Sequence, residues 1–323
     1  MSTFQRLAAL LLFAQLLVAA PAGKDCTGTI SSLDDVDDAV ECTTVNINAF
    51  TVPAGETFNL DLADGTTVTM NGDVTFGTKN WDGPLFEVRD SITFNGNGHT
   101  FNGRWPRHQW RLTKPDPMMK IKISGTFTNV KVLNSPARVY SVSNPRHSSC
   151  PNSPSITHNS NQDDCLAINK GTNIVFQQTA AQEATGSISS DAIVSGIVVA
   201  NNVVTTKSAR SSDPHQDQGF SNRCLRLQFT YSGNTATGLR QFGVLIDQSY
   251  PDTLGTPGTG VTISDINFVG STNSFTVNSG ADRVAVNCGA GACTGTWDWS
   301  ALEVSGGVAG PITNFNGIEN FSQ

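Results

Sequence analysis

The chain has few charged residues and, outside its N-terminus, no long apolar run. Asp, Glu, Lys and Arg together make up 15% of its 323 residues, and the formal net charge is −7. A negative chain has no general attraction to polyanions, which argues against a nucleic-acid-binding protein and requires locally placed Arg and Lys for any acidic ligand. The Cys and His residues nowhere have the spacing of a zinc site, so we expect no metal ion.

The apolar run at the N-terminus has the features of a secretory signal. Arg6 provides a basic start, residues 7–17 are apolar, and small residues follow at 18–20. We therefore predict a signal peptide over residues 1–20 and a secreted, extracellular product. The run is shorter than a membrane-spanning helix and no comparable run follows it, so we expect no membrane anchor.

Glycine and asparagine punctuate short segments that have a β pattern. Such segments recur at spacings of roughly 20 to 50 residues, which is typical of a strand-based repeat. A right-handed parallel β-helix and a β-sandwich both fit short strands with turn signals, and the frequent Asn-Gly turns favour the β-helix. No linker divides the chain, so we predict one all-β domain over residues 21–323. The clearest β-patterned segments are 91–98, 120–134, 166–176, 192–204, 243–247 and 260–269.

Two local patterns refine this prediction. Leu33, Val36 and Val40 are spaced as on one face of a helix, with Asp residues between them. We predict an amphipathic helix over residues 33–40 that caps one end of the β-helix. Further along, Lys120 and Lys122 alternate with apolar residues, which is typical of the solvated face of a strand rather than of a ligand site.

The most informative stretch is residues 161–173, Asn-Gln-Asp-Asp-Cys-Leu-Ala-Ile-Asn-Lys-Gly-Thr-Asn. It resembles the catalytic coil of the polygalacturonases, glycoside hydrolase family 28. The resemblance implies a pectin-lyase-like, right-handed parallel β-helix and a secreted endo-acting enzyme that hydrolyses α-1,4-galacturonan, the backbone of pectin, with inversion. It also implies no cofactor, a monomeric protein, pectin as the substrate and a plant inhibitor protein as a further partner.

The resemblance assigns roles to single residues. Asp163 matches the general acid, and Asp164 matches one of two carboxylates that activate the attacking water. Inverting hydrolysis needs both roles, because the acid protonates the leaving oxygen while the base activates water on the opposite face of the sugar. Tyr250, which follows a Gly-Val-Leu-Ile-like strand, matches a tyrosine of the site, and Arg226 is the remaining candidate for binding the substrate carboxylates.

Seven cysteines in a secreted chain imply disulfide bonds with one cysteine left over. The resemblance implies two bonds, Cys26–Cys42 around the predicted helix and Cys288–Cys293 in a small loop. The cysteines without an obvious partner are Cys150, Cys165 and Cys224.

Three motifs that the resemblance would require are missing. No Asn-Thr-Asp motif, the place of a third aspartate, stands between Asn134 and Asn161. Gln182 and the residues after it stand where a Gly-His-Gly motif would follow Phe176. An Arg-Ile-Lys motif, which would bind substrate carboxylates, is absent from the segment before Tyr231.

The genetic code gives these losses a common explanation. When residues 178–186 are back-translated as CAA ACA GCT GCT CAG GAG GCC ACG GG, dropping two nucleotides yields Asn-Ser-Cys-Ser-Gly-Gly-His-Gly, which contains the missing histidine. Residues 104–111, 145–156 and 214–228 likewise contain family-like motifs in another frame, Arg-Ile-Lys among them. We interpret these four segments, called the shifted patches below, as frameshifted between in-frame flanks, and we expect irregular local structure within them.

Three interpretations of the whole chain remain open. It is an active secreted endopolygalacturonase, a non-catalytic β-helix that binds pectin or an inhibitor protein, or a decayed product that folds poorly. Because the third aspartate, the histidine and the Arg-Ile-Lys motif are all missing, we expect impaired or absent hydrolysis, and whether the chain is an enzyme stays open at this point.

Overall fold

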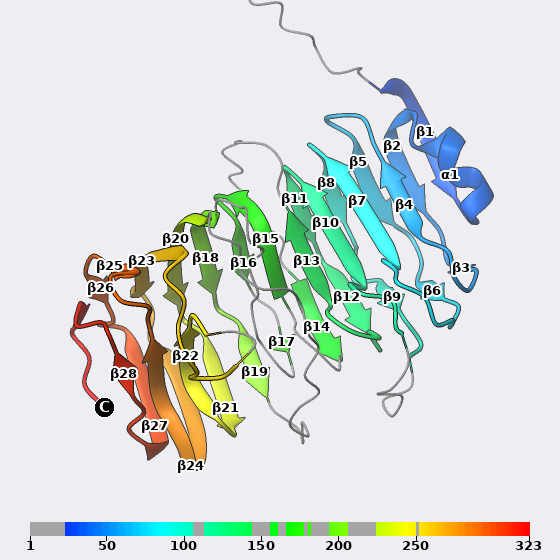
Figure 1. The fold of residues 1–323 in the computed structure, drawn as a ribbon. Coiled ribbons are helices and arrows are strands. Elements are labelled where there is room, and N and C mark those ends of the chain that lie inside the picture. The colour runs from blue at the N-terminus through cyan, green and yellow to red at the C-terminus, as the bar shows by residue number, and fades with distance from the viewer. Residues whose placement is uncertain are drawn as a thin grey trace, which may run out of the picture.

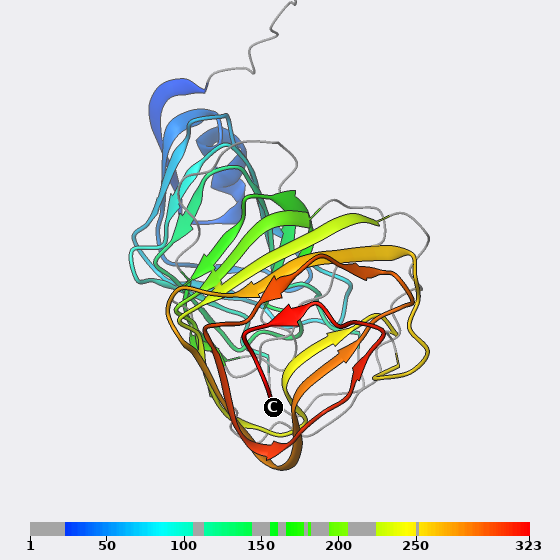
Figure 2. The same cartoon turned by 90° about the vertical axis from the view of Figure 1, so that its left-hand side faces the viewer.

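The computed structural model describes residues 23–105, 113–143, 156–160, 166–177, 180–181, 194–205, 224–249 and 252–323. In these residues the chain winds into stacked coils whose strands form sheets along the stack (Figure 1). Figure 2 shows the same stack from its C-terminal side. Every strand pair in the described part is parallel, as a β-sandwich would not allow, so the predicted parallel β-helix is confirmed.

Two five-stranded sheets form two walls of the N-terminal coils. In spatial order, the first contains β1 (Lys24–Ile30), β2 (Cys42–Ile47), β5 (Thr67–Met70), β8 (Thr93–Asn95) and β11 (Thr126–Thr128). The second contains β14 (Ile156–Ser160), β12 (Val130–Leu133), β9 (Thr100–Asn102), β6 (Val74–Phe76) and β3 (Phe50–Val52).

A ten-stranded sheet forms the third wall and continues into the C-terminal coils. Its order begins with β4 (Phe58–Asp61), β7 (Phe86–Asp90), β10 (Met119–Ile123), β13 (Tyr140–Ser143) and β15 (Leu166–Thr172). It continues with β18 (Val194–Ala200), β20 (Cys224–Ser232), β23 (Val261–Phe268) and β25 (Cys293–Thr294), while β16 (Val175–Gln177) pairs with β18 beside this path.

The C-terminal coils add two further sheets. A seven-stranded sheet contains β17 (Ala180–Ala181), β19 (Val203–Thr205), β21 (Thr235–Leu239), β24 (Asn273–Asn287), β22 (Phe242–Asp247), β27 (Leu302–Val308) and β28 (Ile312–Thr313). A two-stranded sheet contains β26 (Trp297–Asp298) and β29 (Ile318–Glu319). Strands therefore occur in each of the segments predicted to be β.

In these segments apolar side chains that face the core alternate with polar side chains that face away from it, which favours strands. In β10, Met119 and Ile121 are buried, whereas Lys120 and Lys122 point away from the core. Neighbouring strands stay in register, because Met119 pairs with Phe86 of β7 on one side and with Tyr140 of β13 on the other. A slip by one residue would bring the lysines into the core, so the apolar pattern fixes the register.

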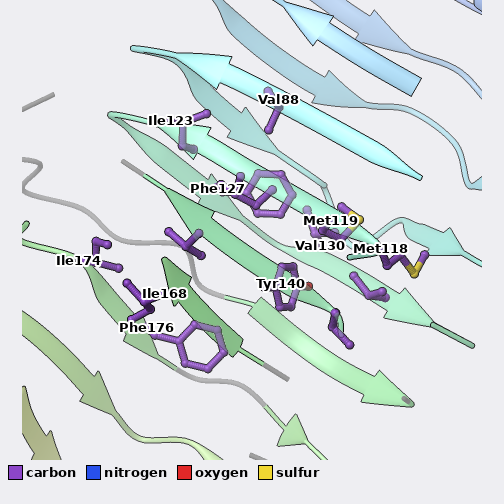
Figure 3. Close-up of a cluster of buried hydrophobic side chains, with 14 of the residues drawn as sticks. Val88, Met118, Met119, Ile123, Phe127, Val130, Tyr140, Ile168, Ile174 and Phe176 are labelled. Carbon is purple, nitrogen blue, oxygen red and sulfur yellow. The ribbon is translucent and has the colours of Figure 1, made fainter. Parts of the chain in front are cut away.

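The interior of the coils is filled by stacked apolar side chains, many of them aromatic. The rings of Phe94 and Phe127 stack across β8 and β11 with centroids 4.6 Å apart, and Phe86 lies 4.7 Å from Phe101. Burying one such side chain contributes about 1.5–3 kcal/mol. Figure 3 shows the neighbouring part of this interior, with Met119, Phe127, Tyr140, Ile168 and Phe176.

A short helical segment covers the N-terminal end of the stack. A 3₁₀ turn, Leu33–Asp35, leads into helix α1 (Val36–Ala39), close to the predicted 33–40. The Asp35 carboxylate accepts the backbone N–H groups of Ser31 and Ser32, both at 2.8 Å, and these bonds lower the pKa of Asp35. Within the described residues no helix is long and apolar enough to cross a membrane.

Three buried asparagines form a column in one turn of the C-terminal coils. Asn202 Nδ2 donates to Asn234 Oδ1 at 2.9 Å, and Asn234 Nδ2 donates to Asn273 Oδ1 at 2.7 Å. The two outer members also donate to the carbonyl oxygens of Phe176, at 3.2 Å, and Tyr231, at 3.1 Å. A side-chain amide suits this position because it has both N–H donors and an oxygen acceptor, so each asparagine can hydrogen-bond to the asparagine of the next coil.

Candidate functional site

The acidic doublet Asp163-Asp164 lies outside the described residues, between two strands that the structure does describe. β14 ends at Ser160 beside β12, and β15 begins at Leu166 beside β13 in the ten-stranded sheet. The segment with the doublet therefore connects one wall of the coil to the next. The strand predicted directly after the doublet is confirmed.

The strands next to the doublet carry small polar side chains on their outer face. Ser141 and Ser143 alternate with Tyr140 and Val142, which belong to the core. Asn169 of β15 donates from Nδ2 to Ser141 Oγ at 2.5 Å. Ser141 and Ser143 are only 5% and 8% exposed, and neither hydroxyl nor amide groups take up a proton at neutral pH.

A bidentate ion pair that was not among the predicted site residues lies where β13 begins. Arg138 donates from Nε to Asp116 Oδ1 at 3.0 Å and from Nη2 to Asp116 Oδ2 at 2.7 Å. Arg138 stands two residues before Tyr140, as Asp164 stands two residues before Leu166, and Tyr140 and Leu166 are paired across β13 and β15. The sequence did contain a signal for this pair. Arg138 is a charged residue shortly before a strand, in the same position relative to its strand as Asp164.

Arg226 lies on β20, whose backbone the structure describes in that part while its side chains there lie outside the description. β20 pairs with β18 and β23, so two strand spacings separate it from β15. The register against β23 shifts between Cys224 and Leu227 and again between Leu227 and Phe229. The first shift spans Arg226, but similar shifts occur in β1–β2 and β21–β24, outside the shifted patches, so the expected irregularity of the patch 214–228 stays a prediction.

Beyond Phe229 the same strand returns to regular packing. The Tyr231 ring stacks on Phe268, with centroids 4.7 Å apart and an interplanar angle of 15°. Burial raises the pKa of the Tyr231 hydroxyl to about 12. Tyr231 is thus neutral at any physiological pH, and its partly buried ring packs against the core.

Tyr250 lies outside the described residues, but the turn that leads to it is well anchored. Asp247, the last residue of β22, accepts hydrogen bonds at Oδ1 from Ser249 N at 2.9 Å, Ser249 Oγ at 2.7 Å and Asn287 Nδ2 at 2.9 Å. Its Oδ2 accepts from Leu254 N at 2.7 Å. One carboxylate therefore binds described residues on both sides of position 250, Ser249 and Leu254. The strand predicted before Tyr250 is confirmed.

Both predicted disulfide bonds are present, Cys26–Cys42 and Cys288–Cys293. The first joins β1 to β2 around the helical segment, and the second closes a loop between β24 and β25. Cys150 and Cys165 lie outside the described residues, and of Cys224 the structure describes only the backbone. In the described part of the chain, His, Cys, Asp and Glu residues nowhere gather in threes that could hold a metal ion.

Comparison with known proteins adds an independent line of evidence. The family model for glycosyl hydrolases family 28 matches residues 154–322. A probable endopolygalacturonase of Neosartorya fischeri is 32% identical over 312 residues, which cover 82% of each chain.

Two solved structures are similar in fold. Endopolygalacturonase I from Stereum purpureum, complexed with two galacturonates, has a TM-score of 0.66 and 35% identity, covering 88% of this chain and 96% of its own. The polygalacturonase from Erwinia carotovora has a TM-score of 0.50 at 12% identity, covering 95% of this chain and 99% of its own, and it supports the fold alone. These likenesses agree with the right-handed coil that parallel crossovers favour.

Proposed function

Since the chain belongs to glycosyl hydrolase family 28, we propose that it derives from a secreted endopolygalacturonase that hydrolyses the α-1,4 bonds of galacturonan with inversion. The observation that carries this proposal is the doublet Asp163-Asp164 in its family-like context, directly before β15. The relatives with similar chains are endopolygalacturonases, and one of them binds galacturonate. Residues 1–20 would be removed as a signal peptide, leaving residues 21–323 as one monomeric extracellular domain.

In this mechanism the two carboxyl groups act on opposite sides of the scissile bond. Asp163 protonates the leaving oxygen, and Asp164 helps to deprotonate the water that attacks the anomeric carbon. In inverting enzymes such groups stand about 6.5–9.5 Å apart, which leaves room for the water. Arg226 and Tyr250 would bind the sugar at this site. No cofactor or metal ion takes part in the proposed reaction.

We further propose that the present chain is an impaired catalyst. The third aspartate, the histidine and the Arg-Ile-Lys motif are missing from the sequence. On the outer face of β13 and β15, the described polar residues beside the doublet are Ser141, Ser143, Asn169 and Lys170. None of them is a carboxylate, so none replaces the second base for the attacking water.

The expected loss follows from these missing groups. Positioned proton transfer contributes about 10²–10⁴-fold to an enzymatic rate, and charge-assisted bonds that hold the sugar in register contribute further. Because such effects do not simply add, we predict hydrolysis at least about a thousandfold slower than in an endopolygalacturonase with all three motifs. The measurement is reducing-end release from polygalacturonate, with Asp163→Asn as the blank.

The outcomes of this assay separate the open interpretations. Slow hydrolysis that Asp163→Asn abolishes supports an impaired enzyme. Activity at the level of an intact relative, abolished by the same substitution, would show that the chain has rebuilt its site and that the impairment is wrong. Sequencing the coding DNA across the four shifted patches tests the frameshift itself, since uninterrupted frames that encode the printed residues would leave only divergence.

A non-catalytic role is the second candidate, and one observation favours it. Described strands flank every shifted patch and still pair in parallel, for example β9 with β12 and β18 with β20. A surface that binds pectin or a plant inhibitor protein could therefore persist without catalysis. In that case the chain would bind polygalacturonate equally well before and after Asp163→Asn and would release no reducing ends in either form.

A further inference from the structure

Three cations surround one carboxylate on the outer face of the ten-stranded sheet. Glu87 Oε1 on β7 accepts hydrogen bonds from Lys122 Nζ at 2.6 Å and from Arg89 Nη2 at 3.2 Å. Lys120 Nζ lies 3.7 Å from Glu87 Oε2. Arg89, Lys120 and Lys122, which we name the cation cluster, thus converge from β7 and β10 on a single acidic side chain.

The carboxylate of Glu87 is mostly buried, whereas the three cationic side chains are partly exposed to solvent. The Glu87 side chain is only 11% exposed, against 38% for Arg89, 35% for Lys120 and 31% for Lys122. Burial alone would raise the pKa of Glu87, but the hydrogen bond from Lys122 and the charges of Lys122, Lys120 and Arg89 outweigh burial and lower that pKa below its ordinary value. Glu87 is therefore ionised at neutral pH and holds the cations in place.

Positive charge is in excess at this place on an otherwise acidic protein. Among the described residues, the other carboxylate that forms an ion pair with the cluster is Asp61 of β4, whose Oδ1 lies 3.5 Å from Arg89 Nε. Two carboxylates therefore face three cations, although the whole chain carries a net charge of −7. An ammonium group has three N–H donors and a guanidinium group has five. Glu87 and Asp61 cannot occupy all of these donors, so the cluster can accept a further anion.

The cation cluster lies on the same wall of the coil as the strand that follows the acidic doublet. Glu87 pairs with Lys120 of β10, Lys120 with Ser141 of β13, and Ser141 with Ala167 of β15. Figure 1 shows β7, β10, β13 and β15 side by side in this order. With a spacing of about 4.8 Å between strands, β10 lies about 10 Å and β7 about 14 Å from β15. On this face β13 carries Ser141 and Ser143, which are 5% and 8% exposed.

We propose that Arg89, Lys120 and Lys122 form an accessory subsite that binds carboxylates of an unesterified polyuronide chain, two to three strand spacings from the acidic doublet. The inference rests on the proposed function, because a polyuronide that crosses the doublet along the stack of strands presents its next carboxylates to this cluster. The lysine pattern, which the sequence analysis assigned to a solvated face, is on this proposal both solvated and a ligand site.

The test measures binding rather than turnover, so an impaired catalyst is no obstacle. Equilibrium binding of fluorescently labelled tri- and decagalacturonate is compared for the unmodified chain, for the double variant Lys120→Gln/Lys122→Gln, and for Lys131→Gln. Lys131 is the matched control, since it is an exposed lysine on β12 of a different sheet. We expect the decamer to bind the unmodified chain about tenfold more tightly than the trimer. The double variant should lose that factor for the decamer alone, because each exposed charge pair adds a few-fold in affinity.

A second ligand keeps the test valid if the double variant does not fold. Fully methyl-esterified decagalacturonate has the same length without the charges, so it should bind the unmodified chain about tenfold more weakly than the free acid. Equal affinity for the esterified and free decamers overturns the subsite, as does an unchanged decamer affinity in a folded double variant. An equal loss in Lys131→Gln also overturns it, since the effect would then be general charge. If the trimer and the decamer bind tightly and equally, the subsite is overturned while the proposed function stands. If neither oligomer binds, both the subsite and the proposed function are overturned.

Discussion

Removing the middle amide of the buried asparagine column should destabilise the C-terminal coils severely. Asn234 is 6% exposed and its side chain takes part in four hydrogen bonds. Nδ2 donates to the carbonyl oxygen of Val199 at 2.8 Å and to Asn273 Oδ1 at 2.7 Å. Oδ1 accepts from the backbone N–H of Asn202 at 3.1 Å and from Asn202 Nδ2 at 2.9 Å.

The magnitude follows from this count. An intramolecular hydrogen bond contributes about 0.5–1.5 kcal/mol net, and a buried donor left without a partner costs about 1–3 kcal/mol. Asn202 Nδ2 keeps Phe176 O, and Asn273 Oδ1 keeps the backbone N–H of Asn234, so the main loss for the neighbouring coils is the bond from the backbone N–H of Asn202 to Asn234 Oδ1. We therefore predict that Asn234→Ala lowers the free energy of unfolding by about 3–5 kcal/mol, a large part of the 5–15 kcal/mol that stabilises a folded protein.

Two further variants distinguish hydrogen bonding from the filling of space. Asn234→Asp keeps the volume but places an oxygen against Val199 O and Asn273 Oδ1, so it should destabilise at least as much as Asn234→Ala at neutral pH. Asn48→Ala is the control, because Asn48 makes one side-chain bond, to Ser31 Oγ at 3.1 Å near the surface, and its removal should cost less than about 1 kcal/mol.

The assay combines urea unfolding, followed by circular dichroism, with hydrogen exchange. A stack of coils can open locally, so the exchange rate of the Asn202 amide reports on the column itself. It should rise at least about 30-fold in Asn234→Ala, which corresponds to about 2 kcal/mol. Near-native stability of Asn234→Asp, or equal effects of Asn234→Ala and Asn48→Ala, would refute the reasoning that the amide bonds between coils, rather than side-chain volume, hold this turn.

Two other predictions concern stability. The pKa of Glu87 is lowered in the folded chain from an ordinary value of 4.5, so its stabilisation is full above that value and is lost as the pH falls through the folded pKa. Glu87→Gln should therefore cost about 1 kcal/mol in urea unfolding at pH 7 and progressively less as the pH falls below 4.5, and a pH-independent difference would contradict the ion-pair origin. Removal of the Cys26–Cys42 bond, whose cysteines are 16 residues apart, should lower the free energy of unfolding by about 3 kcal/mol. Removal of the Cys288–Cys293 bond, whose cysteines are 5 residues apart, should lower it by about 2 kcal/mol, and the reverse order would contradict a loop-entropy origin.

Features that depend on neighbours in the sequence were predictable. The spacing of Leu33, Val36 and Val40 defined the capping helix, because a helical face is a local pattern. The alternation of Lys120 and Lys122 with apolar residues defined β10 for the same reason. The parallel coil followed from many such strands with Asn and Gly turns. Each of these inferences needed no knowledge of which coil lies on which.

Features that depend on the stacking of coils were not predictable. The paired residues Phe58, Phe86, Met119, Tyr140 and Leu166 are separated by unequal lengths of chain, so no fixed period brings one coil onto the next. The contact of Glu87 with Lys122 and the pair of Arg138 with Asp116 arise only from that register. The asparagine column likewise required the knowledge that the turns before β19, β21 and β24 coincide. Of the predicted catalytic and substrate-binding residues, the described part of the chain places only the backbone of Arg226.

The architecture also explains why a family fold can outlast a family activity. In a stack of coils each coil contacts mainly its two neighbours, so stability is a sum of local terms. The chain on each side of the patch 104–111 still pairs strand by strand, since β9 joins β12 and β10 joins β13. Catalysis lacks this tolerance, because acid, base and substrate-binding groups come from several coils and must act together on one bond. A folded β-helix is therefore compatible with both proposed functions, and only an assay that isolates Asp163 can separate them.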